Sequence, residues 1–164
     1  FVQLLLLTGA RKGEARLMRW RDVDTVKRIW TVPRSKNGRS RRIVLSSAAL
    51  STLDSTRTQA LHLGLPTKPD NYVFTNPKTL TAYHSFYAAW FVARDRADLS
   101  DVRIHDLRHT YASMLINSGV SLYEVQTLLG HSSMQMTQRY AHLEPNLLHQ
   151  RTEIVSKTIS GLGI

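Results

Sequence analysis

The stretch of sequence that decides the fold class is residues 104–140, which reads IHDLRHTYASMLINSGVSLYEVQTLLGHSSMQMTQRY. Apolar side chains recur in its first part at the spacing of one helix face, which predicts a helix over 104–118 that ends at Gly119. These apolar residues are Leu107, Tyr111 and Leu115. Because the best-patterned segment of the chain is helical, we expect helices to make up most of the fold.

Two more helices are expected in the rest of this stretch. Ser121 and Glu124 have the spacing of a capping box, so a helix should begin there and bury the apolar side chains that follow. These side chains are Val125, Leu128 and Leu129. Gly130 should end this helix, and one of the two serines that come next can cap a short helix that leads to Tyr140.

Two β-rich runs lie nearer the N-terminus, at 28–33 and 40–46. The dipeptide Asn37-Gly38 lies between them and is a strong signal for a hairpin turn. We therefore expect an antiparallel hairpin with Lys36 near its tip. No apolar residue lies close by in the sequence to hold this tip, so the Lys36 side chain is expected to be mobile in the free protein.

Helical patterns cover much of the remaining chain. One helix ends at Thr8-Gly9, and the others are expected at 13–20, 47–63, 81–97 and 146–160. The helix over 81–97 should bury Phe86, Ala89, Trp90 and Ala93. Residues 72–74 are a candidate short strand, and Pro145 predicts a break before the last helix.

Length and composition limit the class of protein. The 164 residues fit one domain, and 42% apolar with 21% charged residues excludes a disordered or fibrous chain. The longest apolar run, Leu4 to Leu7, is far shorter than the roughly 20 residues that span a bilayer, and no signal peptide is expected before it. A soluble cytoplasmic protein is therefore expected. The start at Phe1, inside an apolar stretch, indicates a fragment of something longer.

The positive charge is concentrated in one segment. The net charge is +10, and residues 11–42 hold twelve basic against three acidic side chains. Sixteen of the 22 basic residues are arginine, whose planar guanidinium can bind a phosphate through two parallel hydrogen bonds. A polyanion is the expected partner. The alternative is a solvated basic face that serves only solubility.

The residue types present argue against metal chemistry. Without cysteine the chain has no disulfide, thiolate metal site or cysteine nucleophile. His105 and His109 have the i, i+4 spacing of paired zinc ligands, but the glutamate of the metalloprotease pattern is missing, with no obvious third ligand. A metal-dependent nuclease would need clustered carboxylates, and Asp22 and Asp24 lie among basic residues instead.

Three motifs, in order along nearly the whole chain, resemble the boxes of the tyrosine recombinase (phage integrase) catalytic domain. They are Thr8-Gly9-Ala10-Arg11-Lys12-Gly13-Glu14, His105-Asp106-Leu107-Arg108-His109-Thr110, and Leu128-Leu129-Gly130-His131-Ser132-Ser133 followed by Tyr140-Ala141-His142. The resemblance implies a mostly α fold with a small antiparallel β-sheet (α+β), formed by residues 1–164 as one catalytic domain. It also implies that the family's amino-terminal core-binding domain is absent here.

The resemblance further implies a set of catalytic residues that needs neither a metal nor a cofactor. They are Arg11, Lys36, His105, Arg108, His131 and Tyr140. Tyr140 would attack the scissile phosphate to form a 3′-phosphotyrosyl bond, and Lys36 would protonate the departing 5′-oxygen. Only about one free tyrosine in a thousand is ionised at pH 7, so the nucleophile needs a neighbouring cation or base.

The basic residues have separate implied roles. Arg11 and Arg108 would bind the non-bridging oxygens, and His131 would donate a further hydrogen bond. His105 would act on the tyrosine proton, with His109 as a structural or supporting partner. Glu14 and Asp106 would orient the arginines and neighbouring backbone.

Double-stranded DNA is the implied partner. The candidate DNA-binding residues around the hairpin are Arg34, Arg39, Arg41 and Arg42. Because phosphate contacts dominate, the chain alone is expected to bind DNA weakly and with a strong salt dependence. A strand-exchange reaction also implies other protomers, in a tetramer on DNA, and no membrane.

The carboxy-terminal helix could serve in such an assembly. Its apolar residues are Leu147, Leu148, Ile154, Val155 and Ile159. They would dock on a neighbouring protomer or, as the alternative, pack back on their own domain. With docking in trans, Tyr140 is expected to be displaced by a few ångströms from the other catalytic residues when DNA is absent.

Two other functions share these sequence features. A type IB topoisomerase uses the same tyrosine and basic residues but rejoins the same strand. A DNA-binding module that has lost its chemistry would keep the charge and the fold, but all six candidate catalytic residues are present, which argues against it.

Overall fold

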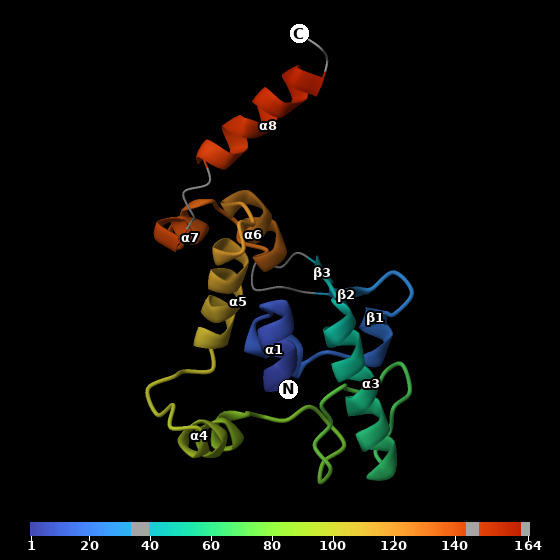
Figure 1. Ribbon diagram of the computed structural model, residues 1–164. Coiled ribbons are helices and arrows are strands. Elements are labelled where there is room, and N and C mark those ends of the chain that lie inside the picture. The colour runs from blue at the N-terminus through green and yellow to red at the C-terminus, as the bar shows by residue number, and fades with distance from the viewer. Residues whose placement is uncertain (34–39, 144–147, 162–164) are drawn as a thin grey trace.

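The computed structural model describes residues 1–33, 40–143 and 148–161, with only the backbone at 148–151 and 161 (Figure 1). The elements, in chain order, are α1 Val2–Thr8, α2 Lys12–Arg16, the 3-10 turn η1 Trp20–Asp22, β1 Val23–Asp24, β2 Ile29–Val32, β3 Arg41–Val44, α3 Ser47–His62, α4 Tyr87–Arg96, α5 Asp106–Asn117, α6 Leu122–Leu129, α7 Gln135–Gln138, η2 Ala141–Leu143 and α8 Leu148–Gly161. The expected mostly α fold is confirmed. None of the described helices is long and apolar enough to cross a membrane.

The small sheet confirms the pairing of the two β-rich runs. The described strands form one antiparallel sheet in the order β1-β2-β3. Trp30 on β2 lies opposite Ile43 on β3, and Val32 lies opposite Arg41. Trp30, Val32 and Ile43 are buried, so this face of the sheet packs on the core. The hairpin tip with Lys36 lies outside the described residues.

Helix α1 lies at the centre of the fold. It packs against both α3 and α5, and Figure 1 shows it between them. Its last turn ends at Gly9, which has the left-handed φ of 60°. A Cβ atom at Gly9 would lie 2.4 Å from Cδ1 of Tyr111 on α5, so only glycine allows this approach. The first and second sequence motifs are thereby brought together.

A second apolar cluster joins the helices of the carboxy-terminal half. The expected capping box begins α6, where Oγ of Ser121 accepts a hydrogen bond from the backbone N–H of Glu124 at 3.3 Å. Gly130 ends the helix with a left-handed φ of 64°. The buried members of the cluster are Ala112, Ile116, Val125, Leu129 and Tyr140. Tyr140 is therefore part of a packed core as well as a candidate nucleophile.

The prediction of a helix over 81–97 is only partly correct. Helix α4 begins at Tyr87, because residues 81–86 before it form bends and Ala82 makes an isolated β-bridge with Thr75. Trp90 is buried as expected, but Ala89 and Ala93 are exposed. The short helix packs on the rest of the domain through one narrow face, so its other side chains reach solvent.

The strand considered at 72–74 does not form. Tyr72 makes only an isolated bridge with Arg19, and residues 72–74 do not join the sheet of β1, β2 and β3. Val73 and Phe74 are nevertheless buried, which explains the apolar pattern that suggested a strand.

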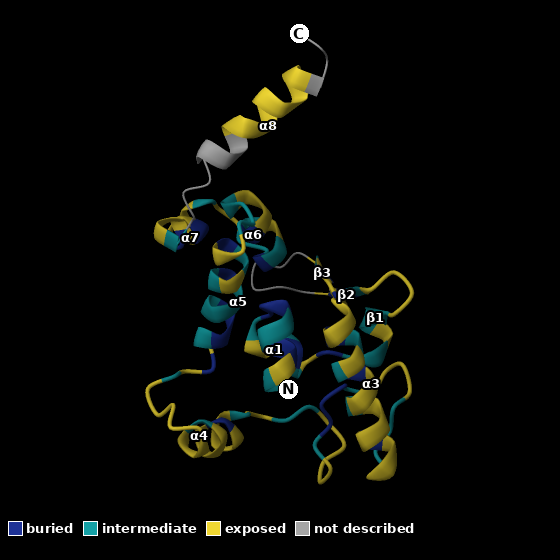
Figure 2. Cartoon of the chain, viewed as in Figure 1, coloured by how far each residue is buried: buried dark blue, intermediate teal, exposed yellow. Residues whose placement is uncertain are grey.

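Helix α8 extends away from the other helices (Figure 1). The side chains from 152 to 160 are exposed (Figure 2). Among them Ile154, Val155 and Ile159 are 62%, 60% and 46% exposed. This described part of the tail does not pack back on its own domain. Pro145, where a break was expected, lies outside the described residues.

Candidate active site

Arg108 is buried where three segments of the chain meet. It is 5% exposed, and its Nη1 and Nη2 donate to the carbonyl oxygens of Gly9 at 2.5 Å and Leu129 at 2.7 Å. Leu129 is the last residue of α6, where the helix dipole is negative and favours a cation. Burial, together with the charges of Arg11 and Arg41, lowers the pKa of Arg108 to about 10, so it remains a cation at neutral pH.

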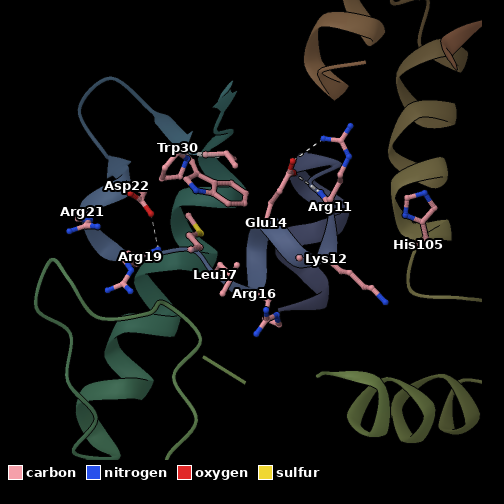
Figure 3. Close-up of a pocket in the computed structure, with 14 residues that line it drawn as sticks. Arg11, Lys12, Glu14, Arg16, Leu17, Arg19, Arg21, Asp22, Trp30 and His105 are labelled. Carbon is pink, nitrogen blue, oxygen red and sulfur yellow. Dashed lines mark hydrogen bonds and ion pairs between the residues drawn. The ribbon is translucent and has the colours of Figure 1, made fainter. Parts of the chain in front are cut away.

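Glu14 holds two of these arginines together. Its carboxylate is 6% exposed and accepts hydrogen bonds from Nη1 of Arg11 at 2.8 Å and Nη2 of Arg41 at 2.7 Å. Burial raises the pKa of Glu14, but the hydrogen bonds and charge of Arg41, with those of Arg11, outweigh burial and leave this pKa lowered. The carboxylate also accepts the backbone N–H of Arg11 at 3.0 Å, which fixes Arg11 at the start of α2 (Figure 3).

Arg41 links the sheet to the helical part of the site. Its Nε and Nη2 donate to Glu14, and its Nη1 donates to the carbonyl of Leu129 at 3.0 Å. A Cβ atom at Gly130 would lie 2.9 Å from Cδ of Arg41, so glycine is required next to this contact. Arg41 is predicted from the sequence as a DNA-binding residue, and the structure gives all three of its guanidinium nitrogens partners inside the protein. Arg42, the next candidate, is exposed.

His131 follows Gly130 and is held by the helix that precedes the tyrosine. Its Nδ1 lies 2.8 Å from Oγ1 of Thr137, which is 0% exposed on α7. Burial lowers the pKa of His131 to about 4, and the charges of Arg108 and Arg11 act in the same direction. The ring is therefore neutral at neutral pH, and its Nδ1 is held by Thr137.

Tyr140 lies in the turn that follows α7, two residues after Gln138, and is 6% exposed. Its phenolic oxygen lies 2.5 Å from Nδ1 of His109 on α5. Burial raises the pKa of Tyr140, and the positive charges of Arg139 and Arg108 oppose this effect. The backbone N–H of Tyr140 donates to the carbonyl of Thr137 at 3.0 Å, so the tyrosine follows closely on the residue that binds His131.

His105 lies at the edge of this group. It is the N-cap of α5 and is exposed, with its ring 5.2 Å from that of His109 in an edge-to-face arrangement. Partial burial and the charges of His109 and Arg108 lower the pKa of His105. The resemblance implies that His105 removes the proton of the tyrosine. In the described residues, however, the histidine that shares a hydrogen bond with the Tyr140 hydroxyl is His109.

Five of the six catalytic candidates lie in the described part of the chain, and electrostatic interactions connect them. These five are Arg11, His105, Arg108, His131 and Tyr140. Lys36 and the DNA-binding candidates Arg34 and Arg39 lie outside the described residues. Within residues that the structure describes, no three histidine or carboxylate side chains gather as metal ligands.

A cavity of about 640 Å³ opens beside Arg11. Arg11 and His105 lie at one side of it and Trp30 lies at the other, with further arginines along α2 and η1 (Figure 3). These arginines are Arg16, Arg19 and Arg21. Arg11 therefore lines this cavity together with other basic side chains.

Thr137 and the bridging role of Arg41 could not be assigned from the sequence. Thr137 is three residues before Tyr140, a spacing that indicates a shared helix face but no partner. The contact of Arg41 with α6 depends on how the sheet meets the helices, which no local pattern encodes.

The phage integrase family model matches residues 1–146. The chain belongs to this family. It is 32% identical over 154 residues to the integrase of Salmonella phage P22, covering 90% of this chain and 39% of that protein. It is also 32% identical over 141 residues to a shufflon-specific DNA recombinase of Escherichia coli, covering 85% of this chain and 33% of the recombinase. The chain thus spans about a third to two fifths of the length of these two relatives.

Solved structures of the family have the same fold. The crystal structure of XerA recombinase superposes with a TM-score of 0.69 at 28% identity, covering 91% of this chain and 54% of that one. The catalytic domain of bacteriophage HP1 integrase gives 0.68 at 26% identity, covering 93% of this chain and 78% of that domain. The α+β recombinase fold predicted from the three motifs is therefore confirmed.

Proposed function

We propose that this chain is the catalytic portion of a site-specific DNA recombinase that acts through a covalent 3′-phosphotyrosine at Tyr140. The observation that carries the proposal is a set of hydrogen bonds that links Arg11, Arg108 and His131 with the turn of Tyr140, from segments that are far apart in the sequence. Glu14 and Arg41 join Arg11 to the Leu129 carbonyl that Arg108 also binds. Thr137 binds His131 through its hydroxyl and the backbone N–H of Tyr140 through its carbonyl. Relatives named as an integrase and a DNA recombinase support the same activity.

The charges of the site suit a phosphodiester. Arg11 and Arg108 stabilise the non-bridging oxygens as the pentavalent phosphorane forms, and their positions are fixed before the substrate arrives. When the hydroxyl of Thr137 donates a hydrogen bond to Nδ1 of His131, the ring proton lies on Nε2, and this N–H can donate a hydrogen bond to a phosphate oxygen. This tautomer fits the neutral state that burial imposes on His131.

The reaction conserves the number of phosphoester bonds. A bond forms between the phenolic oxygen of Tyr140 and phosphorus, and the bond from phosphorus to the 5′-oxygen breaks. That oxygen leaves with the electron pair and takes a proton from Lys36. The 5′-hydroxyl of a second strand later attacks the phosphotyrosine and frees the phenol, so the exchange needs no nucleotide cofactor.

Trapping the covalent intermediate tests this function. A library of nicked DNA duplexes, incubated with the protein and separated under denaturing conditions, should yield a protein–DNA adduct. Tyr140→Phe should abolish the adduct, while Tyr123→Phe, a tyrosine 69% exposed on α6, should retain it. Adduct formation by Tyr140→Phe at the rate of the unmodified chain would refute the assignment. A protein that binds DNA without any adduct would be a binding module.

A second assay separates recombination from strand relaxation. A type IB topoisomerase would relax supercoiled DNA by rejoining the same strand, whereas a recombinase resolves a four-way junction into exchanged products. We expect junction resolution. Relaxation with no exchanged product would favour the topoisomerase.

We also propose that α8 docks on another protomer in the assembly on DNA. The exposed side chains of Ile154, Val155 and Ile159 support this proposal, since they leave an apolar face uncovered. Deleting residues 146–164 should abolish assembly on DNA and alter cleavage. Unchanged assembly and cleavage would contradict the proposal.

A further inference from the structure

The hydroxyl group of Tyr140 has a specific neighbour that the family resemblance does not assign to it. In the described part of the chain its hydrogen-bond partner is Nδ1 of His109, at 2.5 Å. His109 is on α5, one turn beyond His105 and on the same side of that helix. Of the two histidines, His109 is the one within reach of the phenol.

We propose that His109, rather than His105, is the general base that accepts the proton of Tyr140 during DNA cleavage. This inference rests on the proposed function, because it names a residue for one step of the same reaction. A general base must lie within hydrogen-bond reach of the proton it removes, and His109 meets this condition in the free protein.

The environment of His109 favours the neutral ring, which can accept a proton. Burial lowers the pKa of His109, and the charge of Arg139 acts in the same direction, so the ring is neutral at neutral pH. In the tautomer with its proton on Nε2, Nδ1 carries the lone pair and accepts the hydrogen bond of the Tyr140 hydroxyl. The other charged or titratable groups that act on this ring are Arg103, His105, Asp106, Arg108 and Tyr140. Of these, Asp106 favours the protonated ring, which helps the imidazolium once it forms.

The proton does not move before the substrate is bound. The ordinary pKa of tyrosine is far above that of histidine, and burial raises the pKa of Tyr140 further. The resting pair is therefore a neutral phenol and a neutral imidazole. Transfer of the Tyr140 proton to His109 becomes favourable only as the bond to phosphorus forms. The negative charge then passes to the phosphate oxygens, which Arg11 and Arg108 stabilise.

The proton is then returned in the joining step. During cleavage the phenolic oxygen bonds to phosphorus and its proton passes to Nδ1 of His109, giving an imidazolium. When a 5′-hydroxyl attacks the phosphotyrosine, the bond from phosphorus to the phenolic oxygen breaks. The departing oxygen takes the proton back from His109, so the histidine is unchanged over the full reaction.

Two substitutions separate a base from a residue that only positions the phenol. His109→Asn keeps an oxygen acceptor near the place of Nδ1 but cannot take up a proton near neutral pH, whereas His109→Leu removes both properties. We expect both variants to form the adduct about 100-fold more slowly on the nicked DNA library, the usual effect of losing a general base. His62→Asn, an exposed histidine on α3, is the matched control and should stay within about twofold.

A more acidic nucleophile should rescue the base-deficient variant. With 3,5-difluorotyrosine at position 140, the phenol needs less help to lose its proton, so the rate of His109→Asn should recover about tenfold or more. The same replacement should do little for Lys36→Ala, whose defect is in the leaving group. If His109→Asn cleaves at the rate of the unmodified chain with the same pH profile, this inference fails while the proposed function stands.

The contact can also be tested without DNA. The hydroxyl of Tyr140 stabilises the neutral ring of His109, so Tyr140→Phe should raise the pKa of His109 in an NMR titration. Tyr123→Phe, at an exposed tyrosine on α6, is the control and should leave the pKa of His109 unchanged. An unchanged pKa for His109 would show that the contact is absent in solution and would overturn the inference. If the unmodified chain forms no adduct on the nicked DNA library, the proposed function itself is overturned.

Discussion

Two sides of the active site are held in place by different forces. The anion-binding side, made of Arg11, Glu14, Arg41 and Arg108, is joined by ion pairs and by hydrogen bonds from guanidinium groups to backbone carbonyls. The nucleophile side, made of His109, His131, Thr137 and Tyr140, is joined by single hydrogen bonds between neutral groups. Charged contacts between buried groups are costly to break, whereas neutral ones are exchanged more easily. We infer that the protein keeps its phosphate site rigid and its nucleophile adjustable.

The largest expected effect comes from removing the charge at the centre of the anion-binding side. Glu14→Gln leaves Arg11 and Arg41 without a buried counter-charge, and breaking such a pair costs about 3–5 kcal/mol. Urea denaturation followed by circular dichroism should show this loss in the free energy of unfolding. Asp70→Asn is the control, because its ion pair with Arg21 is exposed and should contribute at most about 1 kcal/mol. Equal losses of stability from the two substitutions would show that the buried ion pairs of Glu14 contribute no more than the exposed ion pair of Asp70.

Gly9 supports the anion-binding side through its backbone conformation. Gly9→Ala places a methyl group 2.4 Å from the Tyr111 ring in a left-handed conformation, and we expect a loss of about 3 kcal/mol in the free energy of unfolding. Gly13→Ala is the matched control. No atom lies within 4 Å of a Cβ there, and alanine favours a helix, so this change should be neutral or stabilising by less than about 1 kcal/mol. Similar thermal unfolding of the two variants would show that the approach of α1 to α5 is not tight.

The sequence predicted the elements of the site better than their connections. Gly9, Gly130 and the capping box at Ser121 have local signals, since each reflects the geometry of a helix end, and each prediction is confirmed. The hydrogen bond between His109 and Tyr140 links residues 31 positions apart, and local spacing cannot encode it. The family resemblance pointed to His105 because a resemblance compares positions within motifs. The contact between His109 and Tyr140 depends instead on how α5 packs against the turn after α7.

In the fold too, locally encoded features were predicted correctly and features that depend on distant neighbours were not. The hairpin pairing follows from local turn chemistry and is correct, while the burial of Ala89 and Ala93 was inferred from periodicity alone and is wrong. Periodicity shows which residues share a face, but whether that face is covered depends on the neighbouring elements. The short α4 has few such neighbours among the described residues, and most of its surface faces solvent (Figure 2).

On the nucleophile side the expected effects are smaller in stability and larger in rate. Thr137→Val keeps the shape of the buried side chain and removes its hydrogen bond to His131, so the free energy of unfolding should fall by about 1 kcal/mol. Without this bond the His131 ring loses its fixed tautomer, and adduct formation should slow about tenfold. Thr127→Val, which removes an exposed threonine's bond to the Tyr123 carbonyl on α6, should leave the adduct rate unchanged. A normal rate in Thr137→Val would show that the tautomer of His131 does not depend on this contact.

A loss of stability in mild acid is the last expected effect, and it distinguishes the two sides of the site without any substitution. Burial lowers the pKa of His105, His109 and His131 from 6.5, that of His131 to about 4, so the unfolded chain binds more protons than the folded one between these values. The stability from these neutral rings is complete above pH 6.5 and is lost as the pH falls toward 4. Glu14 has a lowered pKa as a carboxylate, so its contribution is lost only below its ordinary value of 4.5. Urea unfolding at intervals from pH 7 to 4.5 should therefore show a gradual decline that comes from the histidines and that His131→Gln reduces. A free energy of unfolding that rises over this range, or a decline that His131→Gln leaves unchanged, would show that His131 is not held neutral by its surroundings.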